Sequence, residues 1–382
     1  PVVPQGGNTG LVGGSVPSTG DEVVLSLSRM NSVLDFDPLA GVVTCEAGCV
    51  LDDVNSALAE HRFMMPLDLG SSGTCQIGGN LATNAGGLRV IRYGSLRSHV
   101  LGLEVVLASG EVVDLMSTLR KDNTGYDLKQ MFIGSEGTLG VITKAALTCP
   151  PIPESVHVAL LGLDSFEEVL QALAEMKRGL GEVLSAIEFW DTGAMDLVLE
   201  QCNVAVPAHP LPGHESRFYV LVEVAGGSAE ADQERLFHCL QPYSKGIVAS
   251  EPAKVARLWA VRENIPVALK QRGGRTFKYD VSLPTKLLDR ATALVADALR
   301  DSGGAAAEAV VYQYGHVGDG NLHLNVWSGA GEAEGKQIKE VIEDTLYPYL
   351  EAVGGSISAE HGIGVLKANA FARFKPLANQ RL

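Results

Sequence analysis

Short runs of apolar and β-branched residues, separated by turn residues, dominate the first 150 residues of the chain. Runs of this kind predict strands, here at residues 23–27, 42–46, 102–108 and 111–115. Residues 51–61 instead carry apolar side chains at helical spacing and predict a helix. The run Cys149-Pro150-Pro151-Ile152-Pro153 then interrupts any regular element, so we expect a domain boundary there.

Beyond this boundary, strand and helix patterns alternate. They predict strands at 156–161, 183–189, 218–224, 276–283, 310–315 and 322–327, and helices at 165–178, 253–271, 284–300 and 335–352. Pro266 falls inside one of these helices and should kink or break it. The pattern predicts an α+β domain, with an antiparallel sheet covered by helices on one face. We therefore expect a first domain over residues 1–150, a second over 151–370, and the start of a C-terminal segment at 371–382.

Composition narrows the range of functions. The chain has 45 acidic and 30 basic residues, and a net charge of -15 repels phosphate backbones, which argues against nucleic-acid binding. Its 6 cysteines include no CxxC pair and favour free thiols in a reducing compartment. No apolar run reaches the roughly 20 residues that a membrane helix needs. The first residues already lie within a patterned region, so we expect a piece of a longer precursor.

Three segments rich in small residues, at 4–15, 66–87 and 133–143, are the first chemical signal. Glycine lets the backbone approach a ligand closely, and successive exposed N–H groups can hold an anion such as a pyrophosphate. Any one segment could equally be a flexible surface loop. Three of them among apolar strands favour one long ligand, such as a dinucleotide. A Rossmann NAD site is not indicated, because no GxGxxG motif follows a strand.

A histidine pair is the second signal. Asp319-Gly320 is a hairpin turn sequence, which would place His316 directly opposite His323 on neighbouring strands. Opposed side chains share a face, and Asn325 would lie on that face two residues further on. Two such imidazoles can chelate a divalent ion, although an ordinary pair of strand histidines fits the pattern equally well.

Glu360 and His361 stand between a predicted strand at 356–358 and the turn Gly362-Ile363-Gly364. Adjacent charged residues in such a setting are costly unless they are paired or coordinated. Glu360 is therefore a candidate third ligand. Two imidazoles and one carboxylate suit Zn²⁺, although Mn or Fe could also bind.

Taken together, residues 1–15, 66–107, 120–143, 314–326 and 358–364 resemble the FAD-dependent oxidoreductases typified by vanillyl-alcohol oxidase and p-cresol methylhydroxylase. The resemblance covers nearly the whole chain and is greatest to members that oxidise D-2-hydroxyglutarate. It implies an α+β fold, with an FAD-binding domain of this type and an α+β substrate domain built on an antiparallel sheet. The family's FAD domain begins before the first glycine loop, so residues 1–150 are expected to be that domain without its N-terminal part.

The resemblance also implies the cofactor contacts. In the family the first glycine loop holds the FAD pyrophosphate, and the other two segments line the flavin and the adenosine. The FAD contacts implied for this chain are Pro4, Gly6, Gly7, Asn8, Thr9, Gly10, Gly13, Gly14, Ser15, Leu69, Gly70, Gly78, Gly79, Thr83, Gly86, Gly87, Glu136, Gly137 and Ile142. None of the three segments contains a histidine, so the flavin should be bound non-covalently.

Roles in the reaction follow from the same resemblance. The family's metal ligands match His316, His323 and Glu360, and its catalytic base matches His361. The substrate-binding residues that it implies are Arg262, Lys278 and Asn325. For Arg262 and Lys278 the alternative is an ordinary solvated surface charge.

The implied reaction is metal-assisted oxidation of D-2-hydroxyglutarate to 2-oxoglutarate, with a hydride passed to FAD and electrons to an external acceptor. That acceptor would be electron-transfer flavoprotein in the mitochondrial matrix if the source is eukaryotic; a bacterial enzyme would be cytoplasmic. Two alternatives stay open. One is a D-lactate or glycolate dehydrogenase of the same fold, and the other is a non-catalytic fragment that binds metal but no flavin.

Overall fold

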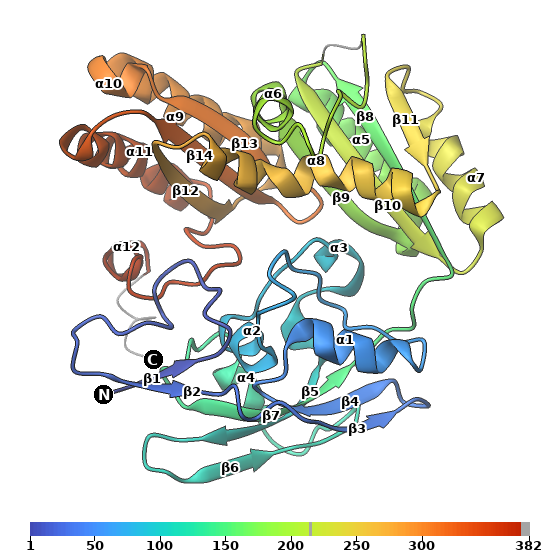
Figure 1. Cartoon of the computed structure of the whole chain (residues 1–382), viewed down its shortest axis with the longest axis vertical. Helices are drawn as coiled ribbons and strands as arrows, with labels where there is room; N and C mark the ends of the chain where they lie inside the picture. The colour runs from blue at the N-terminus through green and yellow to red at the C-terminus, as the bar shows by residue number, and fades with distance from the viewer. Residues whose placement is uncertain (214–215, 376–382) are drawn as a thin grey trace. The chain divides into compact units, whose positions relative to one another are not determined.

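The computed structural model describes residues 1–213 and 216–375, which form two compact units. Unit 1 comprises Pro1–Ile152 and Glu360–Leu382, and unit 2 comprises Pro153–Ala359 (Figure 1). The first division lies in the proline-rich run at 149–153. Residues 360–370, assigned by the sequence analysis to the second domain, cluster with unit 1 instead. Of the expected C-terminal segment 371–382, residues 376–382 lie outside the described residues.

Unit 1 is built on a five-stranded antiparallel sheet of order β3-β4-β7-β5-β6. Its strands are β3 (Val33–Asp37), β4 (Val42–Glu46), β5 (Val100–Val106), β6 (Val112–Leu115) and β7 (Val141–Thr148). A separate parallel pair, β1 (Val2–Gln5) and β2 (Val23–Ser26), flanks the first glycine segment. The helices are α1 (Leu51–Ala59), α2 (Ile77–Thr83), α3 (Val90–Tyr93), α4 (Lys129–Phe132) and α12 (Ala368–Phe374), with a 3₁₀ turn at Leu96–His99.

The core of unit 1 explains the placement of α1 and α2. Leu51, Val54 and Leu58 recur at helical spacing along α1 and are almost completely buried. Ile77 and Leu81 bury the same stripe of α2, and both helices contribute to one hydrophobic cluster with β4, β5 and β7. The second glycine segment, which includes α2, is thereby anchored to the sheet.

Unit 2 contains a seven-stranded sheet of order β11-β8-β10-β9-β13-β14-β12, in which every neighbouring pair is antiparallel. Its strands are β8 (Ser155–Leu163), β9 (Leu184–Asp191), β10 (Phe218–Gly226), β11 (Gly246–Ala249), β12 (Arg275–Ser282), β13 (Val310–His316) and β14 (Asn321–Ser328). Its helices are α5 (Phe166–Leu180), α6 (Thr192–Gln201), α7 (Ala229–Leu240), α8 (Pro252–Gln271), α9 (Leu288–Ser302), α10 (Gly304–Ala307) and α11 (Glu332–Ala352), with 3₁₀ turns at Gly181–Val183 and Thr285–Leu287.

Helices cover both faces of the unit 2 sheet, whereas the sequence predicted one covered face. Phe166 of α5 packs on Phe189 of β9 with ring centroids 5.6 Å apart, while Arg262 of α8 contacts the adjacent Glu188. Neighbouring residues of a strand point to opposite faces, so α5 and α8 lie on opposite sides; α8 crosses in front of the strands in Figure 1. The physical reason is that every residue of β10 is buried, so both faces of the central strands need cover.

A predicted helix break does not occur, and a predicted strand is absent among the described residues. Helix α8 continues through Pro266 to Gln271, so the proline does not break it. Residues 356–358 form only an isolated bridge between Ser282 and Ser356, because the hydroxyl of Ser356 donates to the carbonyl of Ser358 and turns the chain.

Candidate active site

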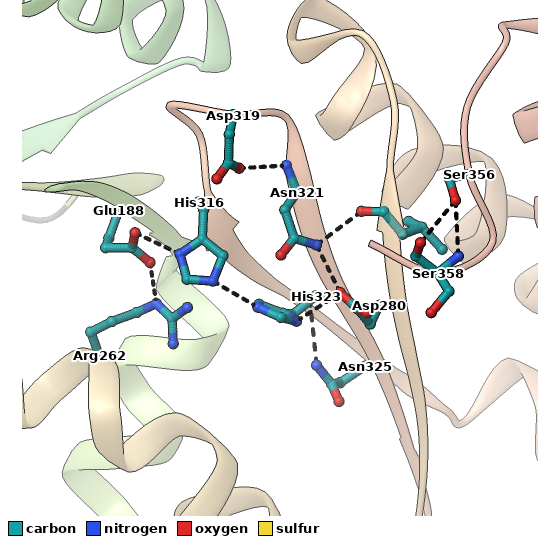
Figure 2. Close-up of polar contacts among 11 residues, drawn as sticks. Glu188, Arg262, Asp280, His316, Asp319, Asn321, His323, Asn325, Ser356 and Ser358 are labelled. Carbon is teal, nitrogen blue, oxygen red and sulfur yellow. Dashed lines mark hydrogen bonds and ion pairs between the residues drawn. The ribbon is translucent and has the colours of Figure 1, made fainter. Parts of the chain in front are cut away.

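Two imidazoles face each other on one side of the unit 2 sheet. His316 ends β13 and His323 lies in β14, and their Nε2 atoms are 3.3 Å apart (Figure 2). The register differs from the prediction, because His316 pairs with Asn321 and His323 pairs with Tyr314. The connection therefore spans residues 317–320. It is tightened by the carbonyl of His316, which accepts from the backbone N–H groups of both residue 319 and residue 320.

The shared face survives this correction. The predicted and observed registers differ by two residues, and side chains alternate across a strand with a period of two. The imidazoles are therefore diagonal neighbours on one face rather than directly opposed. A register error of one residue would instead have sent them to opposite faces.

Each imidazole has a carboxylate beside its other ring nitrogen. Nδ1 of His316 lies 2.7 Å from Oε1 of Glu188, and Nδ1 of His323 lies 3.7 Å from Oδ1 of Asp280. An ionised carboxylate only accepts hydrogen bonds, so it favours the tautomer that carries hydrogen on Nδ1. The two Nε2 lone pairs then point toward each other, which is favourable when a cation lies between them.

The spacing of these nitrogens fits a tetrahedral metal ion. Two nitrogens bound to Zn²⁺ at about 2.0–2.1 Å with a tetrahedral angle are about 3.3–3.4 Å apart. The observed Nε2 separation is 3.3 Å. Carboxylates behind metal-binding imidazoles are also the usual supporting arrangement. The residues present in unit 2 therefore fit a zinc ion.

Glu360, the predicted third ligand, is the first residue of the second segment of unit 1. It directly follows Ala359, whose N–H donates to the carbonyl of Asp280 in β12. The covalent link therefore keeps the backbone of Glu360 within one residue of the strand beside His323. His361 follows Glu360 and precedes a turn at residues 362–364. The carboxylate of Glu136 stabilises this turn by accepting from the backbone N–H groups of Ile363 and Gly364.

The predicted substrate residues all belong to the face that carries the imidazoles. In β12, Lys278 pairs with Asn325 and Asp280 pairs with His323, so alternation puts all four side chains on that face. Lys278 is exposed, whereas Asn325 is 2% exposed. The buried Oδ1 of Asn325 has no hydrogen-bond partner within residues 1–213 and 216–375. A buried, unsatisfied amide oxygen is costly, so it is suited to a ligand contact.

Arg262 reaches the same face from α8. It is 6% exposed, its Nε donates to Oε2 of Glu188 at 2.9 Å, and its guanidinium lies 4.7 Å from the ring centre of Tyr314. The described part of the chain contains no hydrogen bond from its terminal nitrogens. These two nitrogens form the planar fork that binds a carboxylate best.

Sequence reasoning missed Glu188 and Asp280. Glu188 was signalled by a carboxylate in the middle of a mainly apolar strand, a placement that is costly without a partner. Asp280 lies among the polar residues of β12, so no such signal marked it in the sequence. Asn321 supports the second of them, because its Nδ2 donates to Oδ1 of Asp280 at 2.9 Å. At the turn, burial raises the pKa of Asp319 above its ordinary value, while nearby His316 lowers it.

In unit 1 the three glycine segments meet. A Cβ added to Gly6 would lie 3.7 Å from Cα of Gly79, and one added to Gly137 would lie 3.2 Å from Cγ of Pro4. Gly86 in turn adjoins Glu360, where an added Cβ would come within 2.9 Å of Oε1. The carboxylate expected to bind metal thus lies against a segment expected to bind FAD.

The predicted FAD glycines have two different surroundings. Some are packed against the protein itself: a Cβ would lie 1.9 Å from a backbone oxygen at Gly7, 2.2 Å from one at Gly87, and 2.7 Å from the Cβ of Ala47 at Gly78. Others face open space, since a Cβ on Gly10, Gly70 or Gly79 would meet nothing within 4 Å. Open backbone of this kind can be approached closely by a ligand, so the loops fit a dinucleotide.

The other predicted FAD residues have varied contacts. Asn8 has a positive φ of 54°, and its Oδ1 accepts from the hydroxyl of Ser15, which closes the first loop. The hydroxyl of Thr83 donates to the carbonyl of Gly79 within α2. Ile142 is buried in the core of unit 1.

Models of two protein families match the chain. The model described as "FAD binding domain" matches residues 1–116, and the model described as "FAD linked oxidases, C-terminal domain" matches residues 152–378. The second match alone covers more than half of the 382 residues. The chain belongs to the FAD-linked oxidases.

Relatives within this FAD-linked oxidase family are close. D-2-hydroxyglutarate dehydrogenase, mitochondrial, from Rattus norvegicus is 52% identical over 98% of this chain and 68% of its own length. D-2-hydroxyglutarate–pyruvate transhydrogenase from Saccharomyces cerevisiae is 45% identical over 96% of this chain and 74% of its own length. The predicted family is confirmed.

The fold is shared with p-cresol methylhydroxylase. A solved structure of that protein has a TM-score of 0.72 and 16% identity, and the match covers 100% of this chain and 80% of the other. The predicted fold class of this FAD-linked oxidase is therefore confirmed. Within the described residues, no helix combines the length and apolar character needed to cross a membrane.

Proposed function

We propose that this chain oxidises D-2-hydroxyglutarate to 2-oxoglutarate in an FAD-dependent reaction. The observation that carries the proposal is one sheet face that combines a metal-ready imidazole pair with Arg262 and Lys278, in a chain 52% identical to a D-2-hydroxyglutarate dehydrogenase. With a net charge of -15, the protein repels anions in general, so these cations provide a local exception.

The charges of the site favour a dicarboxylate substrate. Arg262 offers two terminal nitrogens for a bidentate contact, and Lys278 adds a second positive charge on the same face. A distal carboxylate would pair with them. The buried Oδ1 of Asn325 only accepts hydrogen bonds, so the C2 hydroxyl of the substrate would supply the donor that it lacks among the described residues.

At the C2 carbon, the metal would activate the hydroxyl and a general base would remove its proton. His316, His323 and Glu360 would hold Zn²⁺ or another divalent ion, which lowers the pKa of a bound hydroxyl. His361 would accept the proton of the C2 hydroxyl as general base. FAD, bound non-covalently by the glycine loops, supplies the two-electron acceptor for the C2 hydride.

A substrate panel tests the proposal. Anaerobic mixing with D- and L-2-hydroxy acids should bleach the flavin absorbance near ~450 nm fastest with D-2-hydroxyglutarate. Faster bleaching with D-lactate or glycolate would contradict the dicarboxylate assignment and favour that second activity. A colourless protein that FAD cannot reconstitute would contradict the flavoenzyme and favour a metal-binding fragment.

Electron transfer onward and location are part of the proposal. We propose electron-transfer flavoprotein as the acceptor and the mitochondrial matrix as the compartment. The name of the rat relative supports the mitochondrial location. The name of the yeast relative indicates pyruvate as the alternative acceptor. Mixing the reduced enzyme with each acceptor separates them, because only the physiological one should restore the oxidised flavin spectrum at a catalytically competent rate.

A further inference from the structure

We infer that Glu188 is a positioning residue that orients the metal ligand His316 and the substrate-binding Arg262 through one carboxylate. The inference rests on the proposed function and deepens it. Glu188 lies in β9, so this strand would link the proposed metal ligand His316 to the proposed substrate ligand Arg262, although neither of those two residues belongs to β9.

The two oxygens of Glu188 are divided between the two ends. Oε1 lies 2.7 Å from Nδ1 of His316, and Oε2 accepts from Nε of Arg262 at 2.9 Å (Figure 2). The Glu188 side chain is 0% exposed. No water therefore reaches the carboxylate to compete for these contacts, and both partners are confined to the geometry that it allows.

Neither contact uses the atoms of the partner that the proposed function needs. The carboxylate holds hydrogen on Nδ1 of His316, so the Nε2 lone pair points at Nε2 of His323, 3.3 Å away. At Arg262 the carboxylate occupies only Nε, so both terminal nitrogens remain for a substrate carboxylate. One rigid group thus fixes the distance between the metal and the anion-binding fork, which favours substrates whose hydroxyl and distal carboxylate match that distance.

Glu188 and Arg262 form a buried ion pair, and removing one partner of such a pair leaves the other charge uncompensated and usually destabilises a protein. Stability is therefore measured beside zinc affinity. Glu223 offers a matched control, because it lies in neighbouring β10, is 2% exposed, and accepts from Nε1 of Trp259 in α8 at 2.9 Å. It has the same residue type and a hydrogen-bond partner from the same helix, and that partner is neither His316 nor Arg262.

The experiment compares full-chain, FAD-loaded Glu188→Gln and Glu223→Gln proteins. Zinc affinity is measured by calorimetric titration of metal-stripped protein without substrate, and KM and kcat are measured for D-2-hydroxyglutarate and D-lactate. Glu188→Gln should weaken zinc binding by about 10–100-fold and raise KM for D-2-hydroxyglutarate more than KM for D-lactate, which lacks the distal carboxylate. Glu223→Gln should change neither.

The outcomes separate this inference from the proposed function. If Glu188→Gln binds zinc with wild-type affinity, or if Glu223→Gln weakens zinc binding equally, Glu188 has no positioning role. If zinc binding responds as expected but D-2-hydroxyglutarate never bleaches the wild-type flavin, the role toward the metal stands and the proposed substrate fails. A lower Tm for Glu188→Gln together with wild-type zinc affinity would show that the carboxylate serves only the fold, which overturns the inference.

Discussion

The glycine segments of unit 1 and the strand face of unit 2 differ in which atoms form the predicted site: backbone atoms in the first and side chains in the second. In unit 1 the shape of the predicted FAD site is set by backbone, as where Gly7 approaches the carbonyl of Thr74 too closely for any side chain. In unit 2 the site consists of side chains, held by hydrogen bonds to the buried carboxylate of Glu188 and by regular strand alternation. A backbone site should therefore be sensitive to added atoms, whereas a side-chain site should be sensitive to removed ones.

Removing a proposed metal ligand should have the largest effect. His323→Ala deletes one of the two imidazoles, so the protein should lose zinc and most of its activity, because both polarisation and orientation of the hydroxyl depend on the ion. FAD should remain, since the glycine segments belong to unit 1. Metal analysis, flavin absorbance and anaerobic flavin reduction measure the three results.

A chelator provides the control, because it should reproduce the effect of His323→Ala in the wild-type protein. If the variant were shown to be metal-free and still reduced its flavin at the wild-type rate, the metal would have no role. His316 and His323 would then be an ordinary pair on neighbouring strands.

Removing the proposed general base should have the next largest effect. His361→Asn should retain about one equivalent of zinc, because His361 is not among the proposed ligands, but should slow flavin reduction by roughly 10²–10⁴-fold. The measurement is rapid anaerobic mixing with D-2-hydroxyglutarate. Loss of zinc from this variant would contradict the division of roles between Glu360 and His361.

The sequence predicted that His316 and His323 share a strand face, but it did not predict the carboxylate of Glu188 that supports them. The shared face of His316 and His323 follows from strand alternation alone, so it survived a register error of two residues. Glu188 lies 128 residues from His316 along the chain, so its contact depends on which strands become neighbours. That order is set by packing of the whole sheet, which local patterns do not determine.

For the glycines, the sequence located the segments but not the structural role of each residue. Their segments were visible in the sequence, but the reason for each glycine was not. Gly78 and Gly79 are adjacent in α2, yet the first packs against Ala47 and the second faces open space. Composition and spacing cannot distinguish these cases, because the difference lies in atoms brought by a distant segment.

This adjacent pair gives the third prediction. Gly78→Ala should destabilise the protein by about 1–3 kcal/mol, the usual cost of overpacking. Gly79→Ala should be neutral or stabilising by up to about 1 kcal/mol in the FAD-free protein, because alanine favours a helix. If Gly79 contacts FAD, the affinity of the Gly79→Ala protein for FAD should nevertheless fall about tenfold or more, equivalent to about 1.4 kcal/mol.

Denaturant unfolding of FAD-free protein and FAD titration of the same samples separate the two effects. Equal loss of stability in both variants would refute the distinction between packed and open glycines. Unchanged FAD affinity in Gly79→Ala would remove Gly79 from the predicted contacts.

The smallest effect is expected at a carboxylate that resembles Glu188 in chemistry but not in burial. Glu104 of β5 pairs with Lys144 of β7 at 2.9 Å, with side chains 18% and 35% exposed. The hydrogen bond from Lys144, aided by Thr143, lowers the pKa of Glu104 below its ordinary 4.5. Because the folded-state pKa is depressed, the pair stabilises the protein fully above the ordinary pKa and loses this contribution as the pH falls through the folded-state pKa.

Glu104→Gln should therefore cost about 0.5–1 kcal/mol at neutral pH, the range for a partly exposed pair. It should leave zinc affinity, FAD content and kcat unchanged. The stability difference from wild type should shrink as the pH is lowered below 4.5, because the wild-type carboxylate then becomes protonated as well. Unfolding midpoints measured across that range test this sign. A difference that stays constant into acid would mean that Glu104 contributes through its shape rather than its charge, and the contrast with Glu188 would then rest on burial alone.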